Sequence, residues 1–190
     1  MKSQKRTFLV LSKLMFSGIF FTLLSCSTDD AVPVNEEELL TTVEITLTSN
    51  GQQVVLVSKD LDGDGPNEPV FTTTGNIMAN TIYQGNIRFL NETEIPAEDK
   101  TIEIAAEDFE HQVFYQLSSG LGSVAYTDAD ENGNPIGLSF TYSSGNIGSG
   151  NLTVILRHLL DKNAPGVADG LIENAGGSTD IQVVFPISIN

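Results

Sequence analysis

The sequence has no tryptophan, only two histidines and a single cysteine, Cys26. A lone thiol cannot form an internal disulfide, and no other cysteine is present to act as a catalytic nucleophile. Basic residues are also scarce: all 25 acidic residues follow Cys26, but only five of the nine lysines and arginines do, which leaves a formal charge of −20 after Cys26. Such a chain repels nucleic acid and anionic lipid head groups, and it favours cations or a partner with a basic face.

Short motifs of the common enzyme classes are missing as well. There is no Gly-x-Ser-x-Gly nucleophile elbow, and the glycine-rich stretch Ser143–Gly150 lacks the lysine of a phosphate-binding loop. No pair of carboxylates stands out for glycoside hydrolysis. We therefore expect a protein that is not an enzyme.

The first 25 residues have the layout of an export signal. Four basic residues and no acid occur in the first 13 positions, and an uncharged, mostly apolar stretch then runs from Leu14 to Leu24. This stretch is shorter than the roughly 20 helical residues that cross a bilayer core. It ends in Leu23-Leu24-Ser25-Cys26, which resembles the lipobox of bacterial lipoproteins. The resemblance implies cleavage before Cys26 and an outer-membrane anchor of palmitate and other acyl chains on that residue.

An acidic segment follows the cysteine and divides the anchor from the domain. Ser27-Thr28-Asp29-Asp30 resembles the surface-export signal of Bacteroidetes lipoproteins, which implies display on the cell surface; the alternative is a flexible polar tether that faces the periplasm. We predict a signal peptide over residues 1–25, a lipid-anchored tether over 26–35 and one domain over 36–190, a length that suits a single core.

The domain has the pattern of an all-β protein. Val43, Ile45 and Leu47 alternate with polar residues, and Asn50-Gly51 is a typical tight hairpin turn. Similar segments bounded by turn residues give about nine strands, and Pro186 favours an edge position for the last one. A short helix is expected within 95–110, where Ile102, Ala105, Ala106 and Phe109 have helical spacing. We predict an antiparallel, immunoglobulin-like β-sandwich. The nine expected strands cover 43–48, 54–57, 70–73, 81–90, 113–117, 123–127, 138–142, 152–158 and 181–189.

Two loops carry alternating acids of the kind that ligate calcium. The first contains Asp60, Asp62, Asp64 and Glu68, and its spacing resembles the first half of an EF-hand or dockerin loop. The second contains Asp128, Asp130 and Asn132 before Gly133. Both lack an acid at the twelfth position, where Phe71 and Ser139 stand. The alternative for each is a hairpin loop in which Asx side chains cap their own backbone.

The two histidines indicate a different kind of site. His111 closes an acidic run that contains Glu107, Asp108 and Glu110, and His158 ends an expected strand. Imidazole and carboxylate ligands suit Zn²⁺ or another divalent transition metal. A shared site requires His111 and His158 to converge, which their spacing does not establish; two separate surface histidines are the alternative. The acids Glu36, Glu37 and Glu38 are further candidate ligands, or else a solvated start of the first strand.

Six segments spread over the domain carry a further resemblance: Asn35–Thr42, Asp60–Gly65, Glu110–Phe114, Tyr126–Asp130, Gly133–Gly137 and Leu156–His158. Together they resemble a family of small flavobacterial lipoproteins. The resemblance implies an accessory role in nutrient or metal capture beside a TonB-dependent receptor. We therefore expect a surface lipoprotein that binds a ligand, with a divalent metal as the candidate. The alternative is a structural or adhesive surface module with calcium-rigidified loops.

Overall fold

The computed structural model describes residues 39–63 and 65–190. The signal peptide, Cys26, the tether, Glu36–Glu38 and Asp64 lie outside the described residues, so these predictions stay predictions. The described residues belong to one compact unit. Within the described part of the chain, no helix is long and apolar enough to cross a membrane.

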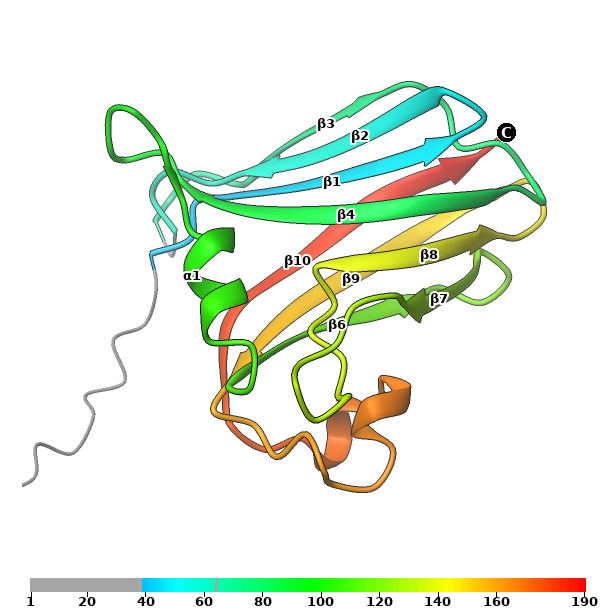
Figure 1. Ribbon diagram of the computed structural model, residues 1–190. Coiled ribbons are helices and arrows are strands. Elements are labelled where there is room, and N and C mark those ends of the chain that lie inside the picture. Colours follow the sequence, from blue (N-terminus) through cyan, green and yellow to red (C-terminus); the bar gives the residue numbers. More distant parts are fainter. Residues whose placement is uncertain (1–38, 64) are drawn as a thin grey trace, which may run out of the picture. The chain divides into compact units, whose positions relative to one another are not determined.

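The described residues form two antiparallel sheets (Figure 1). The larger sheet has the order β3-β2-β1-β4-β8-β7, with β5 paired to β4, and the smaller sheet has the order β10-β9-β6. The prediction of a mainly β sandwich with one short helix is confirmed. The larger sheet contains β1 (Thr42–Ser49), β2 (Gln52–Lys59), β3 (Val70–Thr74), β4 (Ile82–Asn91), β5 (Glu98–Asp99), β7 (Gly122–Tyr126) and β8 (Ser139–Ser144). The smaller sheet contains β6 (His111–Leu117), β9 (Gly148–His158) and β10 (Ser178–Ile189).

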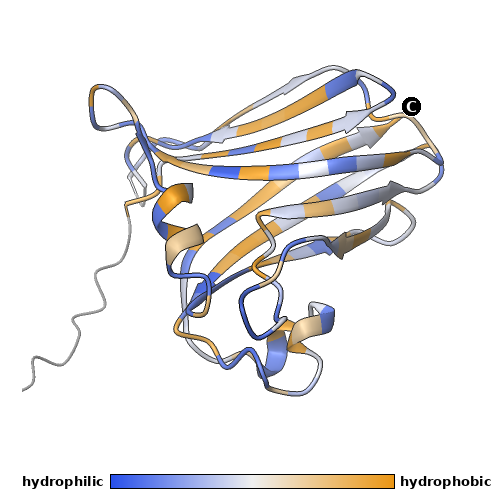
Figure 2. Cartoon of the chain, viewed as in Figure 1, coloured by the Kyte–Doolittle hydropathy of each residue, from blue (hydrophilic) through white to orange (hydrophobic). Residues whose placement is uncertain are grey.

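The core lies between the sheets and follows from alternation along the strands, visible as alternating colours in Figure 2. Val43, Ile45 and Leu47 of β1 are almost fully buried, as predicted. The first hairpin closes through Asn50 and Gly51, which both have positive φ (49° and 76°), as a two-residue turn that follows the twist of the strands requires.

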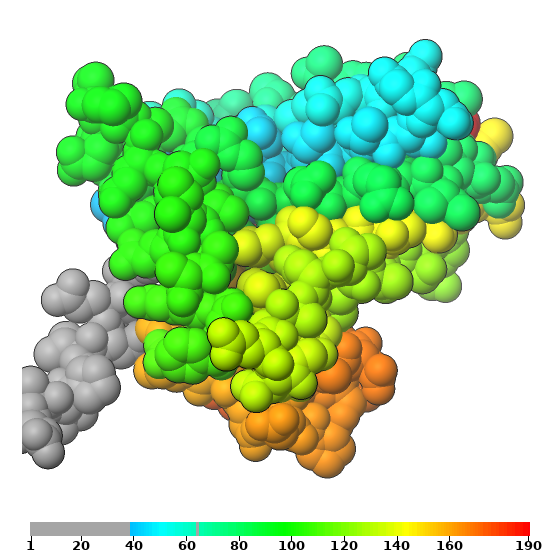
Figure 3. All heavy atoms as spheres, viewed as in Figure 1, coloured from blue at the N-terminus to red at the C-terminus, as the bar shows by residue number. Residues whose placement is uncertain are grey.

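The outer face of the smaller sheet is also covered. The connection between β9 and β10 includes two 3₁₀ helices, η1 (Val167–Asp169) and η2 (Ile172–Asn174), and it packs Leu160, Val167 and Ala175 against Phe114 and Ile155. In Figure 3 this connection forms an orange lobe beside the yellow-green 128–137 loop. Covering both faces explains why β6 is buried at four successive positions from its start.

Three details differ from or refine the sequence prediction. The helix α1 (Thr101–Ala106) exists, but it buries Ile104, while Ile102 and Phe109 are 72 % and 59 % exposed, so the predicted apolar face was wrong. Neither β5 nor the two 3₁₀ helices were expected. Pro186 does lie in β10 at the edge of its sheet, as predicted.

Candidate metal centre

The two histidines meet at one end of the smaller sheet. β6 and β9 are antiparallel neighbours, and their register places His111 directly opposite His158. The rings are stacked, with centroids 4.4 Å apart and planes inclined by 10°. The convergence that sequence spacing left open is therefore present in the structure.

Alternation explains why both rings face the sandwich interior. Val113 on β6 and Leu156 on β9 point into the core, and each histidine lies two positions away on the same face. The His111 side chain is fully buried, whereas the His158 side chain is 11 % exposed. Burial lowers the pKa of His111, and the neighbouring His158 adds to that effect, so His111 is held in its neutral form.

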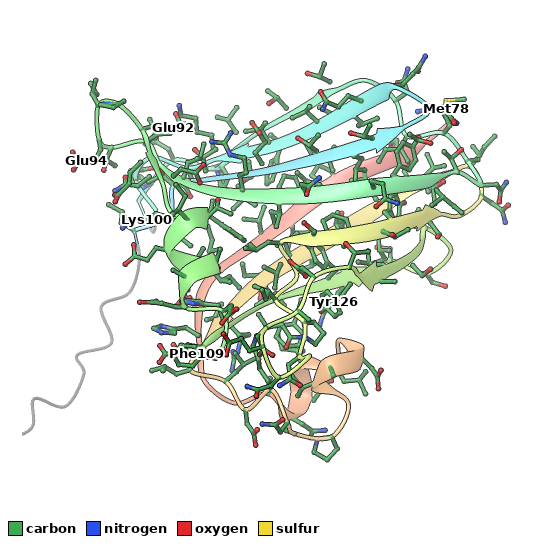
Figure 4. The ribbon with its side chains drawn as sticks, viewed as in Figure 1. Met78, Glu92, Glu94, Lys100, Phe109 and Tyr126 are labelled. Atoms are coloured by element: carbon green, nitrogen blue, oxygen red, sulfur yellow. The ribbon has the colours of Figure 1, made fainter. Side chains whose placement is uncertain are left out.

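The turn between α1 and β6 fixes the tautomer of His111. Its Nδ1 lies 3.2 Å from the backbone carbonyl of Glu107. Since a carbonyl only accepts hydrogen bonds, Nδ1 is the protonated nitrogen in this contact, and Nε2 of the neutral ring carries a lone pair. Nε2 is buried and has no hydrogen-bond partner among the residues the structure describes. Phe109, labelled in Figure 4, belongs to the same turn.

Three carboxylates surround the pair of rings. Glu110 Oε2 lies 3.3 Å from His158 Nε2, and Glu107 Oε2 lies 3.9 Å from His111 Nδ1. Asp180 has a fully buried carboxylate whose two oxygens lie 3.7 Å from His111 Nε2 and 3.9 Å from His158 Nδ1. Glu107, His111 and His158 each offer a ligand atom within 4.8 Å of the others.

Sequence reasoning missed Asp180. The register between β10 and β9 shifts between Thr179 and Ile181, so Asp180 is the extra residue of a β-bulge. A bulge interrupts the two-residue period and re-aims a side chain. The available signal was an acid next to a strand that is otherwise apolar at alternate positions, but alternation alone does not locate a bulge.

Asp108 lies in the same turn, but the contact described for it is made by its backbone and not by its carboxylate. Its backbone carbonyl accepts a hydrogen bond from Lys162. Of the predicted transition-metal ligands, the structure therefore gathers His111, His158, Glu107 and Glu110, and it adds Asp180.

The stacking of the rings limits how an ion can bind. A metal lies near the plane of each imidazole that ligates it, along the nitrogen lone pair. Two parallel rings stacked 4.4 Å apart cannot both meet that condition, so one ring has to turn. His158 is the ring with solvent access, while His111 is enclosed, so His158 is the ring that we expect to rotate.

Hydrogen bonds within the first acidic loop occupy some of its carboxylate oxygens. Asp62 Oδ2 accepts a hydrogen bond from the Asn67 amide side chain at 2.7 Å, and Asp60 Oδ1 accepts one from the Asp62 backbone at 3.3 Å. Glu68 lines a surface groove together with Asp60 and Asp62. Since Asp64 is outside the described residues, a calcium site here stays a prediction.

The second acidic loop has the geometry of a hairpin loop whose Asx side chains cap their own backbone, which was the alternative to a calcium site. Asp128 accepts hydrogen bonds from the backbone N–H groups of Gly137 and Ser139, both at 2.8 Å. Asp130 accepts from the backbone N–H groups of Asn132 and Asn134, both at 2.9 Å. These contacts stabilise the loop without an ion, as Asx turns do.

A buried lysine occupies the centre of this second loop. Lys162 Nζ lies 3.3 Å from Asp130 Oδ2 and donates to the carbonyl of Pro135 at 2.9 Å. The Lys162 and Asp130 side chains are only 3 % and 2 % exposed. Burial lowers the pKa of Lys162 below its ordinary value, and the Asp130 carboxylate offsets only part of this effect. The ammonium group thus provides at Asp130 the positive charge that a calcium ion would otherwise bring.

No protein-family model, curated protein or solved structure matches the chain. The resemblance to flavobacterial lipoproteins therefore stays a prediction. The feature of the described residues that bears on function is the histidine pair with its carboxylates.

Proposed function

We propose that the protein is a lipid-anchored surface lipoprotein whose β-sandwich binds a divalent transition metal ion at His111 and His158. The observation that carries the proposal is the contact between His111 and Asp180. The contact of Nδ1 with the Glu107 carbonyl leaves a lone pair on His111 Nε2. This nitrogen lies 3.7 Å from Asp180 Oδ2, and both side chains are fully buried. A divalent cation that binds at this place gains an imidazole nitrogen and a carboxylate oxygen as ligands.

The distances support a metal centre. Ligand atoms that share a tetrahedral ion at about 2.0–2.2 Å lie roughly 3.3–3.6 Å apart. The contact of 3.7 Å between Asp180 Oδ2 and His111 Nε2 exceeds that range by only about a tenth of an ångström. The contact of 3.9 Å between Asp180 Oδ1 and His158 Nδ1 changes when the His158 ring rotates. Two imidazoles with one or two carboxylates suit Zn²⁺ or Cu²⁺, whereas calcium prefers oxygen ligands alone.

The members of the site differ in their exposure to solvent. Glu110 and the partly exposed His158 lie toward solvent, and His111 and Asp180 lie inside. The net charge of −20 after Cys26 raises the local concentration of cations at the surface. An anchored protein with such a centre suits metal capture beside an outer-membrane transporter, and a TonB-dependent receptor is the partner that the sequence resemblance suggests.

Metal content and affinity test the proposal. The soluble protein from Ser27 onward is analysed for bound metals and titrated by calorimetry with zinc, copper, iron and calcium. We expect one tight transition-metal site, and Co²⁺ substitution would give the visible absorption of a low-symmetry nitrogen and oxygen site. Replacing both histidines, His111→Ala/His158→Ala, should abolish binding.

Single variants separate ligation from folding, since removal of a buried ring disturbs packing. His158→Gln and Asp180→Asn should each weaken zinc binding about tenfold or more, with the exposed Glu173→Gln as a control of equal charge change. Binding of calcium alone, or equal zinc affinity in Asp180→Asn and Glu173→Gln, would contradict the proposal. The first of these results would favour a structural or adhesive surface module instead.

A further inference from the structure

A groove runs along the free edge of β10. It has a volume of about 790 Å³ and lies between Asp180–Val184, the segment that leads into β1, and the residues joining β2 to β3. We call it the edge groove. Leu39, Leu61 and Val184 line it with apolar surface and are 55 %, 52 % and 41 % exposed. Half-exposed apolar side chains grouped in one groove indicate a surface that a partner covers.

The charge of the edge groove has one sign. Asp60, Asp62 and Glu68 line it, and none of its described lining residues is a lysine, arginine or histidine. A second copy of this chain would bring its own excess of acids to the groove and be repelled. A basic partner is the one that charge complementarity favours.

The backbone of β10 offers hydrogen bonds to such a partner. Asn190 donates its N–H to Ile77 and accepts from the N–H of Ala79, so its backbone groups point away from β9. The register with β9 has no shift from Ile181 to Ile189, and backbone groups alternate in direction along a strand. Gln182 and Val184 therefore point their N–H and C=O groups outward as Asn190 does.

These outward groups are the unprotected part of the edge. Pro186 has no N–H to offer, and Ile77 bridges to Ile189 beyond it, so both features block strand addition at the carboxyl end of β10. Among the described residues, no strand pairs with Gln182 or Val184 on the outer side. A short stretch of open edge thus borders the acidic, partly apolar groove.

We propose that the edge groove binds an extended segment of a partner protein in which lysine or arginine alternates with β-branched apolar residues. The segment adds to β10 as a strand through the backbone of Gln182 and Val184. Its apolar side chains contact Leu39, Leu61 and Val184. Its basic side chains face Asp60, Asp62 and Glu68. Asp180 of the proposed metal centre lines the same groove, so peptide binding is measured on the metal-free protein.

The probe is a fluorescein-labelled heptapeptide, Val-Lys-Val-Lys-Val-Lys-Val, titrated by anisotropy with the soluble protein from Ser27 onward in the presence of a chelator. We expect one-to-one binding. A peptide with glutamate in place of lysine should not bind. A peptide of equal charge with proline at its central apolar position should bind about tenfold more weakly, as the loss of one or two net hydrogen bonds predicts.

The matched protein variants are Gln182→Pro and Gln182→Thr. The first removes an outward N–H that β9 does not use, and the second keeps it, so only Gln182→Pro should lose binding while both keep the thermal midpoint of a folded domain. Amide exchange gives a second readout, since the peptide should protect Gln182 and Val184.

Three results would overturn the proposal. Equal affinity for the proline-containing peptide and the original peptide would mean that charge attraction, and not strand addition, drives binding. Unchanged binding by a folded Gln182→Pro variant would place the peptide elsewhere. Binding only by a chain that starts at Leu39 would mean that this protein's own amino-terminal segment, not a partner, occupies the edge groove. Because metal is chelated throughout, none of these results bears on the proposed metal centre.

Discussion

Replacing Lys162 with methionine should strongly destabilise the domain. Methionine keeps much of the apolar stem but removes the ammonium group, which contacts Asp130 Oδ2 and the carbonyl oxygens of Pro135 and Asp108. The carboxylate of Asp130, whose side chain is 2 % exposed, would then lack its compensating cation. Water would have little access to replace it.

The magnitude follows from the burial of the pair. Removing one partner of a buried ion pair costs about 3–5 kcal/mol, compared with 0–1 kcal/mol for an exposed pair. Asp130 keeps the hydrogen bonds from Asn132 and Asn134, which moderates the penalty, so we expect the lower end, about 3 kcal/mol. Asp130→Asn should cost less, because an amide leaves no unpaired negative charge.

Urea denaturation of the wild type, the two single variants and the Lys162→Met/Asp130→Asn double variant measures both the cost and the coupling. We expect the double variant to lose about 1–3 kcal/mol less than the sum of the single losses. The exposed ion pair Arg88–Asp99 is the comparison, tested by Arg88→Met. A loss below about 1 kcal/mol for Lys162→Met, or purely additive losses, would refute the reasoning that this pair acts as a buried unit.

Three further predictions concern the loops, the histidines and the core. Asp128→Ala should cost about 1–3 kcal/mol by leaving two backbone N–H groups without acceptors. Millimolar calcium should shift the thermal midpoints of wild type and Asp128→Ala equally if Lys162 neutralises this loop. In the metal-free protein, burial lowers the pKa of His111 below its ordinary value of 6.5. The folded state therefore disfavours the protonated ring, and its stability falls as the pH drops below 6.5. Between about pH 8 and pH 5, wild type should lose more stability than His111→Gln. Gly85→Ala should cost about 1–3 kcal/mol, since a Cβ would lie 2.2 Å from Cε2 of Phe140, whereas the same change at Gly148 meets only contacts of 3.9 Å.

Local sequence features predicted the strands well because their cause is local. The Asn50-Gly51 turn and the alternation in β1 fixed the first hairpin, and Pro186 located an edge. The apolar face of α1 was misjudged for a physical reason: a helix of six residues is too short for spacing alone to define its buried side. Ile104 is buried because the helix packs on the main core.

The candidate centre depends on contacts between distant parts of the chain. The expected strand after the acidic run began at Val113, so the sequence placed His111 before it, and it did not show that the two histidine-bearing strands, β6 and β9, are neighbours. Asp180 required a bulge, which breaks the alternation on which the prediction was based. Lys162 lies in a connection without regular structure, so its burial against Asp130 had no periodic signal at all.

Lys162 also links the second acidic loop to the proposed metal centre, which leads to a final prediction. Its ammonium group binds the carbonyl of Asp108, in the turn that carries Glu107 and Glu110. That turn fixes the His111 tautomer through the Glu107 carbonyl and places Glu110 against His158. Lys162→Met should therefore weaken zinc binding under conditions where the variant is still folded.

Calorimetry at low temperature, where the variant remains folded by circular dichroism, measures this effect. Positioning contacts outside the ligand shell are worth about tenfold or more in metal affinity, so we expect a loss of about that size for Lys162→Met. Asp128→Ala serves as the control, because it loosens the same loop without touching the turn from Glu107 to Glu110. An equal loss in both variants would assign the effect to general destabilisation, whereas a loss confined to Lys162→Met would show that the lysine holds the turn in the geometry that metal binding requires.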